Sequence, residues 1–350
     1  MLTSKYDENR LVALHDEKIS MLQDSSLQER RTINYLRLSV TDRCNLRCLY
    51  CMPDEGIDFV PHSDILSYEE MLHLVRISVE GGIRKVRLTG GEPLVRKDFI
   101  SFLRSLSAME NLKEVTLTTN GVLLKQYAAA IKDCGICRIN VSLDSLKPER
   151  FFQITRRDLF HKVWEGIEEA ERMSFHPIKI NVVAMKGIND DEVLDFAHLT
   201  MEKPFHVRFI EFMPIGKNNN WKPERFITTG EVLNRIRVLG ELEPLQHHAT
   251  DGPAERFRIK GAKGEVGFIS PVSNHFCGTC NRLRLTADGR LRGCLFSDRE
   301  IDVKAPLREG RGDDYLAGLL RLAIVEKPEG PGCAASRPRK CIRQMSSIGG

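Results

Sequence analysis

The stretch that organises this sequence is Cys44-Asn45-Leu46-Arg47-Cys48-Leu49-Tyr50-Cys51. It places three thiols within eight residues, directly after an apolar segment that we predict to be a strand. Zinc prefers four protein ligands in a closed structural site, and the nearest later candidate, His62, lies beyond a predicted turn at residues 52–56. Iron–sulfur clusters ordinarily take four cysteines. A loop that offers only three would leave one iron free to bind a ligand.

This spacing, with an aromatic residue before the last cysteine, resembles the signature of the radical S-adenosylmethionine enzymes. The resemblance implies that Cys44, Cys48 and Cys51 hold a [4Fe-4S] cluster, whose open iron chelates the methionine part of S-adenosyl-L-methionine. It also implies that Tyr50 packs near the adenine. The alternative is three packing thiols, but cysteines that only pack lie in apolar cores and seldom occur in threes on a polar loop.

Length and composition describe a globular protein. The 350 residues suffice for one large α/β barrel with an appendage, or for two domains. An apolar fraction of 41%, a charged fraction of 29% and a net charge of +4 indicate neither a nucleic-acid partner nor a membrane partner. No stretch reaches the roughly 18 apolar residues of a membrane span. We expect a cytoplasmic protein, in which ten cysteines suggest metal ligands rather than disulfides.

Repeated βα units dominate the first two thirds of the chain. Helical patterns, such as those at 67–80 and 98–109, separate predicted strands that begin near Ile33, Lys85, Lys113, Cys137, Ile178 and His206. Six units are two short of a complete eight-unit barrel. We predict an α/β fold, an incomplete (β/α)6 TIM-type barrel closed by a C-terminal α+β region. The predicted parts are an N-terminal extension (1–32), the barrel (33–214) and the C-terminal region (215–350).

Polar and apolar side chains alternate along these strands, so each strand has a polar row and an apolar row on opposite faces. We expect the apolar rows, including Ile210 and Phe212 on the last strand, to face the helices. A polar interior would suit a charged ligand, although a slip of one residue would turn a row outward. The polar rows are Arg37, Ser39 and Thr41; Arg87 and Thr89; Thr116 and Thr118; Asn140, Ser142 and Asp144; Lys179 and Asn181; Glu211 and Met213.

The run Thr89-Gly90-Gly91-Glu92-Pro93 follows the second strand. Paired glycines permit close approach of the backbone to a ligand, and barrel active sites lie at the carboxyl ends of strands. By resemblance, this is the element that receives the ammonium group of the cosubstrate, with Gly91 in contact. Ser142 and Met213 lie where relatives contact the rest of the cosubstrate.

A second thiol set follows where the βα pattern gives way to short strands and turns. Cys277 and Cys280 have Cys-x2-Cys spacing, and Cys294 follows a predicted hairpin through residues 287–289. A structural zinc site would need His275 as its fourth ligand, which is awkwardly close to Cys277. We therefore favour a second iron–sulfur cluster.

The two thiol sets, the run Asn281-Arg282-Leu283-Arg284 and the terminal Gly349-Gly350 are together similar to the GTP 3',8-cyclase family of molybdenum cofactor biosynthesis. The resemblance implies a lyase with two [4Fe-4S] clusters that converts GTP to (8S)-3',8-cyclo-7,8-dihydroguanosine 5'-triphosphate. The second cluster would bind guanine, and Gly349 and Gly350 would enter the active site. Implied partners are an electron donor and the downstream cyclic pyranopterin monophosphate synthase, for a monomer or homodimer.

GTP carries close to four negative charges, and guanidinium groups match phosphate oxygens. The residues that we assign to GTP come from three strands of the barrel and from the C-terminal region: Arg37, Arg87, Thr118, Lys179, Arg282, Leu283 and Arg284. Two other interpretations stay open. One is a different radical enzyme with an auxiliary cluster, such as a peptide-modifying one, and the other is a zinc-stabilised binding module without catalysis.

Overall fold

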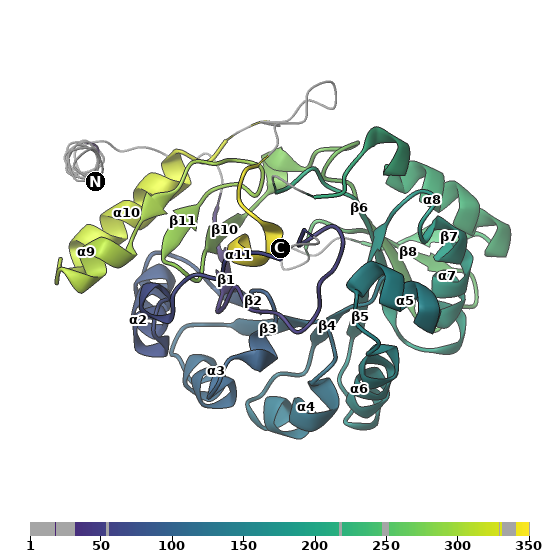
Figure 1. Ribbon diagram of the computed structural model, residues 1–350, viewed down its shortest axis with the longest axis horizontal. Helices are drawn as coiled ribbons and strands as arrows, with labels where there is room; N and C mark the ends of the chain where they lie inside the picture. Colours follow the sequence, from purple (N-terminus) through teal and green to yellow (C-terminus); the bar gives the residue numbers. More distant parts are fainter. Residues whose placement is uncertain are drawn as a thin grey trace.

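The computed structural model describes Lys18 and residues 32–53, 56–216, 219–246, 252–328, 330 and 341–349. The N-terminal extension thus lies almost wholly outside the described residues, as do Cys333 and Gly350. The described chain builds one continuous twelve-stranded sheet that curls around a central space, with helices along its outer face (Figure 1). None of the described helices combines the length and apolar character that crossing a bilayer requires.

Six parallel strands form the middle of this sheet, each paired with the next along the chain, as predicted. They are β1 (Tyr35–Ser39), β2 (Lys85–Thr89), β3 (Glu114–Thr119), β4 (Ile139–Ser142), β5 (Ile178–Ala184) and β6 (His206–Glu211). The helices that connect them are α2 (Tyr68–Glu80), α3 (Phe99–Ser107), α4 (Leu124–Asp133), α5 (Pro148–Thr155), α6 (Phe160–Arg172) and α7 (Val193–Glu202). Parallel pairing requires such crossovers.

Local sequence sets where these helices begin. At the start of α2, the Ser67 hydroxyl accepts a hydrogen bond from the Glu70 amide, and the Glu70 carboxylate accepts one from the Ser67 amide. This capping box satisfies two amide groups that the helix itself cannot pair. It fixes the helix start one residue after Ser67, close to the predicted position.

The C-terminal region extends the sheet at both sides. Strand β9 (Glu265–Ile269) pairs in parallel with β6, and β10 (Arg282–Leu285) pairs in parallel with β1. Beyond them, β8 (Glu255–Ile259) and β7 (Leu242–Pro244) continue one side, and β11 (Arg290–Arg292) and β12 (Ile301–Asp302) continue the other. Among the described strands no pairing joins β9 to β10, so hydrogen bonds do not close the barrel. The predicted incomplete barrel is confirmed, and the connection 270–281 links its two sides.

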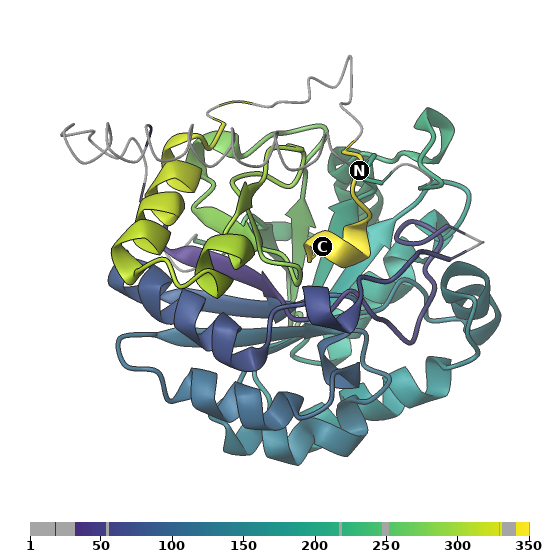
Figure 2. The same cartoon turned by 60° about the vertical axis from the view of Figure 1, so that its left-hand side comes forward.

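The remaining helices lie around this closing region. Helix α8 (Thr229–Ile236) covers β6 and β9, whereas α10 (Asp313–Val325) packs on α2 and β11. The short α9 (Lys304–Arg308) precedes α10, and α11 (Met345–Ile348) ends the described chain. Figures 1 and 2 show α11 over the central space, at the carboxyl ends of the first strands. The chain end is therefore part of the interior of the barrel.

The apolar rows of β1 to β5 pack under the helices as predicted, for example Leu36, Leu38, Val86 and Leu88. Strand β6 differs. Its Val207 and Phe209 lie in the helix-facing core, whereas Arg208 and Ile210 line the central cavity.

The prediction that Ile210 and Phe212 face the helices was wrong, because both line the cavity. The register explains the position of Ile210, which pairs with Val183, another cavity residue on β5. Phe212 lies just after the strand ends at Glu211, where the alternation of the strand no longer applies.

Candidate active site

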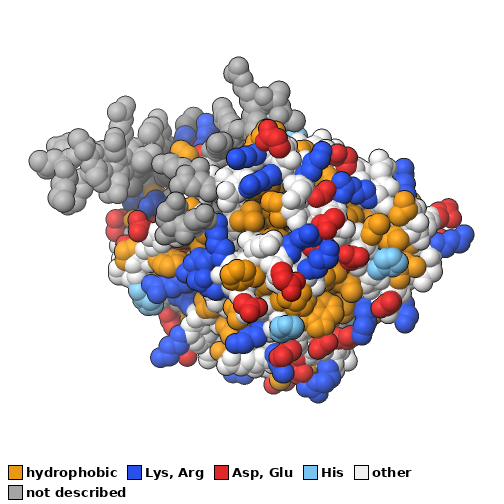
Figure 3. Space-filling model, turned by 45° about the vertical axis from the view of Figure 1, so that its right-hand side comes forward, with side chains coloured by type: hydrophobic (Ala, Val, Ile, Leu, Met, Phe, Trp, Pro, Cys, Tyr) orange, Lys and Arg blue, Asp and Glu red, His pale blue; other side chains and the backbone are white. Residues whose placement is uncertain are grey.

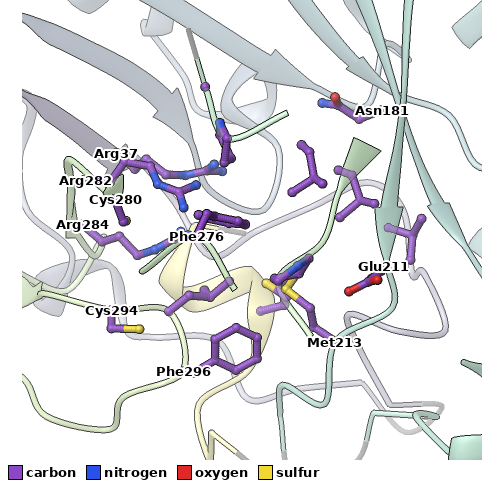
Figure 4. A pocket seen from close by; sticks show the side chains of 18 of the residues that line it. Arg37, Asn181, Glu211, Met213, Phe276, Cys280, Arg282, Arg284, Cys294 and Phe296 are labelled. Atoms are coloured by element: carbon purple, nitrogen blue, oxygen red, sulfur yellow. The ribbon is translucent and has the colours of Figure 1, made fainter. Parts of the chain in front are cut away.

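A cavity of about 240 Å³ occupies the centre of the barrel. Side chains of β1 to β6 surround it, together with the connection 270–281, β10 and α11 (Figure 4). The expectation of a polar interior holds for most of the predicted rows. The cavity residues that we predicted from the sequence are Arg37, Tyr50, Arg87, Thr118, Ser142, Asp144, Asn181, Glu211, Met213, Cys277, Cys280, Arg282, Arg284 and Cys294.

The first thiol loop lies at the carboxyl end of β1, beside this cavity. Backbone hydrogen bonds hold it to the end of α5, from the Arg47 amide to Thr155 and from the Leu49 amide to Ile154, both over 2.9 Å. The glycine pair packs on its other side. A Cβ atom at Gly91 would come within 2.2 Å of the Arg43 carbonyl oxygen. The glycines thus permit close approach to the backbone of this loop, and Gly91 is not among the cavity-lining residues.

The three thiols of this loop are desolvated. Burial raises the pKa of Cys44 to about 11 and that of Cys51 to about 12; burial also raises the pKa of Cys48, with the Asp144 carboxylate and the other two thiols adding to the effect. Cys44 Sγ accepts hydrogen bonds from the Leu46 amide and from Asn120 Nδ2, over 3.4 and 3.6 Å. A metal centre must displace the thiol protons when it binds. Amide donors aimed at the sulfur suit the thiolate that remains.

The second thiol set has a different electrostatic environment. Cys277 and Cys280 lie on the connection 270–281, and Cys294 follows β11. Burial alone would raise the pKa of Cys280, but the cations of Arg282 and Lys327 lower it to about 6. Among the described residues, no three His, Cys, Asp or Glu side chains are placed to hold a metal ion.

Three arginines form a row across three adjacent strands. The parallel register pairs Arg37 of β1 with Arg284 of β10 on one side and with Arg87 of β2 on the other. Burial and the positive neighbours Arg87 and Arg282 lower the pKa of Arg37 to about 10. The cost of bringing these like charges together indicates an anionic ligand. In Figure 4 the side chains of Arg37, Arg282 and Arg284 lie together on the same side of the cavity.

The other residues assigned to GTP are placed differently. Thr118 lines the cavity, and its hydroxyl is buried without a hydrogen-bond partner among the described residues. Lys179 lies on β5, where burial lowers its pKa to about 7, and Arg208 and Arg87 add to this effect. It does not line the cavity. Leu283 is fully buried in the helix-facing core, so only its backbone, between Arg282 and Arg284, borders the site.

Among the residues assigned to the cosubstrate, Tyr50 lines the cavity and is held there by a hydrogen bond. The Tyr50 hydroxyl donates to the Asp144 carboxylate over 2.8 Å, and the Val183 amide donates to the other oxygen of that carboxylate. Burial raises the pKa of Asp144 to about 6. Ser142 and Met213 also line the cavity. Tyr50, which is part of the first thiol loop, is thereby tied to the segment that follows β4.

The chain end connects the first thiol set with the arginine row. Arg284 Nη1 donates to the carbonyl oxygen of Gly349 over 2.7 Å, and a hydrogen bond from the Ser346 backbone to Cys51 partly offsets the burial that raises the pKa of this thiol. Gly349 has φ +69°, and a Cβ atom there would lie 2.5 Å from Thr89 Oγ1. Glycine is therefore required at this position. Gly350 lies outside the described residues.

The sequence interpretation did not assign a role to Arg208 or to Lys327, which both line the cavity. Arg208 lies in the same row of β6 as Ile210, and we had predicted that this row faces the helices and not the interior. Lys327 follows α10 in a segment without any recognised motif. A basic residue flanked by apolar Val207 and Phe209, such as Arg208, was the available signal in the sequence.

Two family models cover most of the chain. Residues 38–200 match the radical SAM superfamily, and residues 205–332 match Molybdenum Cofactor Synthesis C. Their boundary falls between α7 and β6. The first model contains the first thiol set, and the second contains all three cysteines of the second set.

Named relatives match over nearly their full length. The GTP 3',8-cyclase of Thermodesulfovibrio yellowstonii is 51% identical over 322 residues, which cover 91% of this chain and 98% of that protein. The GTP 3',8-cyclase of Pelotomaculum thermopropionicum is 50% identical over 323 residues, with coverages of 92% and 98%.

Among solved structures, Streptococcus suis SuiB bound to S-adenosylmethionine has a TM-score of 0.56 at 14% identity, over 94% of this chain and 80% of SuiB. At this identity the likeness concerns the fold alone. Identity near one half across almost the whole of the named relatives is much stronger evidence. The chain therefore belongs to the GTP 3',8-cyclase family, within the radical SAM superfamily.

Proposed function

We propose that this chain converts GTP to (8S)-3',8-cyclo-7,8-dihydroguanosine 5'-triphosphate in the first step of molybdenum cofactor biosynthesis. Its family membership supports this function. The structural observation that carries the proposal is a cavity lined by a row of arginines and by a second set of thiols, with Tyr50 of the first cysteine loop also in its lining. The negative charge of a nucleotide triphosphate matches the positive charge of the arginine row.

We assign one [4Fe-4S] cluster to Cys44, Cys48 and Cys51 and a second to Cys277, Cys280 and Cys294. Cys44, Cys48 and Cys51 would hold the cluster that, when bound and reduced by an external electron donor, would supply the reductive cleavage of S-adenosyl-L-methionine needed for hydrogen abstraction from C3' of GTP. Tyr50, Ser142 and Met213, which line the cavity, and Gly91, which packs against the first cysteine loop, form the cosubstrate side of the proposed site.

The protein itself contributes binding, orientation and exclusion of water. Arg37, Arg87 and Arg284 offer guanidinium donors in one row, which suits the successive phosphates of a triphosphate. Thr118 offers a buried hydroxyl, and Lys179 and Arg282 add positive charge. Removing these charged side chains from water costs free energy, but it also strengthens their electrostatic attraction to phosphate. A closed cavity protects radical chemistry from solvent.

The proposed reaction also implies partners. An electron donor must reach the first cluster, and a later enzyme of the pathway, a cyclic pyranopterin monophosphate synthase by family resemblance, must consume the product. GTP and S-adenosyl-L-methionine are cytoplasmic metabolites, which supports a cytoplasmic location. The peptide-modifying alternative rests on the fold shared with SuiB, which one solved structure shows bound to precursor peptide SuiA, and at 14% identity that likeness concerns the fold alone.

Anaerobic incubation of the reconstituted protein with GTP, S-adenosyl-L-methionine and dithionite tests the proposal, with the product identified by mass spectrometry and NMR. We expect Cys277→Ala to lose one cluster and the cyclised product, yet to keep cleaving the cosubstrate. Cys137→Ala, at an exposed cysteine that does not line the cavity, is the matched control and should behave as the unaltered protein. Full cyclisation by Cys277→Ala would contradict the substrate-binding role of the second set.

A further inference from the structure

One lysine lies at the centre of the second thiol set. The Lys327 ammonium donates to the Arg282 carbonyl oxygen over 2.8 Å, to the Gly293 carbonyl oxygen over 2.5 Å and to Cys280 Sγ over 3.5 Å. The side chain is buried, with 6% of its surface exposed. An ammonium group has three donors and no acceptor. Two carbonyl oxygens and a sulfur are therefore suitable partners for it.

These contacts join the two arms of the chain that carry the thiols. The Arg282 carbonyl and Cys280 belong to the arm that enters β10 from the connection 270–281. Gly293 directly precedes Cys294 on the other arm, which leaves β11. The two arms are fourteen residues apart in sequence at Cys280 and Cys294. A single side chain from the end of α10 thus bridges the segments that must converge on one cluster.

Backbone packing at Gly293 is a second, independent observation. A Cβ atom at Gly293 would lie 3.1 Å from the Lys327 Cα atom and 3.3 Å from the Ala323 carbonyl oxygen. The arm that carries Cys294 therefore lies directly against the last turn of α10. The position of Lys327 is consequently fixed by packing, and does not depend on the flexible reach of a long side chain.

The positive charge of Lys327 should shift the reduction potential of a nearby cluster in a predictable direction. A [4Fe-4S] cluster with thiolate ligands is anionic, and reduction adds one more negative charge. A cation beside it stabilises the reduced state more than the oxidised state, since hydrogen bonds and charges near the sulfurs set the potential. Arg282 and Arg284 also face this region, but they lie on the wall that we assign to GTP. Lys327 instead contacts both thiol-bearing arms.

We propose that Lys327 is a positioning residue of the second cluster, which ties the Cys280 arm to the Cys294 arm and raises the reduction potential of the cluster between them. This inference rests on the proposed function, because it requires a cluster at Cys277, Cys280 and Cys294. By this inference, the segment that follows α10 helps to retain the second cluster, whether or not GTP is bound.

The test uses the full chain with Cys44, Cys48 and Cys51 changed to Ala, so that only the second cluster remains. In this background we compare Lys327→Met, which removes the donors and the charge, with Lys327→Gln, which keeps two amide donors but no charge. Lys260→Met is the control, since Lys260 is exposed and pairs with Glu241 on the surface. The measurements are the rate of iron loss to a chelator and the midpoint potential of the cluster by EPR-monitored titration.

We expect Lys327→Met to lose iron about 10-fold faster or more, in the range known for partners that orient cluster ligands. Both substitutions should lower the midpoint potential, and Lys327→Gln should retain iron better than Lys327→Met. Unchanged iron loss and unchanged potential in both variants would overturn the inference. If the parent triple variant binds no iron, the assignment of the second cluster itself fails, which is a separate outcome. If Lys327→Met does not fold, the midpoint potential of Lys327→Gln decides. A lower value than that of the parent triple variant supports the inference, and an unchanged value overturns it.

Discussion

Arg284 and Gly349 are joined by a buried hydrogen bond of 2.7 Å, from the guanidinium group to the carbonyl oxygen of the next-to-last residue. The same arginine lies in register with Arg37. The chain end is thus fixed to the wall that we assign to GTP. A change in the tail should therefore be felt at the substrate site.

Gly349→Ala should disrupt this arrangement. Alanine at φ +69° is strained, at a cost of about 1 kcal/mol or more, and its Cβ atom would collide with Thr89 Oγ1. We expect cyclisation to fall about 10-fold or more while global stability changes little, because the tail can leave its site. Gly310→Ala is the matched control, with φ +75° and no atom within 4 Å of the added Cβ. Equal activity of the two variants would show that crowding at Gly349 is unimportant.

Arg37→Met should weaken GTP binding and stabilise the empty protein. Loss of one charged hydrogen-bonding group predicts a Kd increase of about 10- to 100-fold. Relief of repulsion among buried arginines predicts a gain of about 1 kcal/mol in the free energy of unfolding without ligand. Arg292→Met is the contrasting variant, because Arg292 is fully buried and paired with Glu300. Its loss should destabilise the fold by about 3 kcal/mol. Calorimetry and thermal unfolding check both, and destabilisation by Arg37→Met would contradict the argument.

Two adjacent threonines should respond oppositely to the same substitution. Thr118→Val removes a buried hydroxyl without a partner among the described residues, so stability should hold or rise slightly and the Kd of GTP should rise about 3- to 10-fold. Thr119→Val removes a hydroxyl that donates to Glu92 over 2.8 Å and accepts from the Gly121 amide. That loss should cost about 1–3 kcal/mol of stability. Similar unfolding curves for both variants would refute this distinction.

Lys179 should make GTP binding dependent on pH. Burial lowers its pKa to about 7, so near neutral pH it is only partly charged in the empty protein. A bound phosphate favours the charged form, so binding takes up a proton, and affinity should fall as pH rises above about 7. Isothermal titrations in two buffers of different ionisation enthalpy measure this uptake. Lys179→Met should abolish it, and an unchanged proton uptake would exclude Lys179 as its source.

The same shift acts on stability with the opposite sign. Between pH 7 and the ordinary lysine pKa, the unfolded chain binds more protons than the folded chain at this residue. The empty protein should therefore gain stability as pH rises through that window, whereas it loses affinity for GTP. Denaturation curves at several pH values, with Lys179→Met as reference, separate the two effects.

Much of the barrel could be predicted because its signals are local. Alternation on β1 to β5 follows from the geometry of a strand, and the capping box at Ser67 and Glu70 marks the start of α2. The predicted hairpin through residues 287–289 is confirmed as the turn between β10 and β11. These features depend on neighbours in the chain.

The rest depends on contacts between distant segments. The pairing of β10 with β1 joins Arg284 to Arg37 across most of the sequence, and no local pattern specifies it. The contact of Lys327 with the second thiol set likewise depends on how α10 packs. At the end of β6, the inward row that we inferred from Glu211 and Met213 suggested the wrong face for Ile210, because the strand ends at Glu211. The site residues that we assigned came from motif resemblance more than from alternation.

The distribution of charge differs between the surface and the interior of the protein. On the face shown in Figure 3, cationic and anionic side chains alternate over short distances. Positive charge is instead concentrated inside, along the row from Arg284 to Arg87. A count of net charge alone could not reveal this concentration.

The pairing of β1 with β10 and of β6 with β9 has a consequence for biosynthesis on the ribosome. The hydrogen-bonding edges of β1 and β6 stay bare until residues 265–285 have been translated, and bare edges of this kind recruit other chains. The nascent polypeptide is thus exposed to aggregation for most of its elongation. A prematurely terminated product that ends before β9 should need chaperone protection or be degraded.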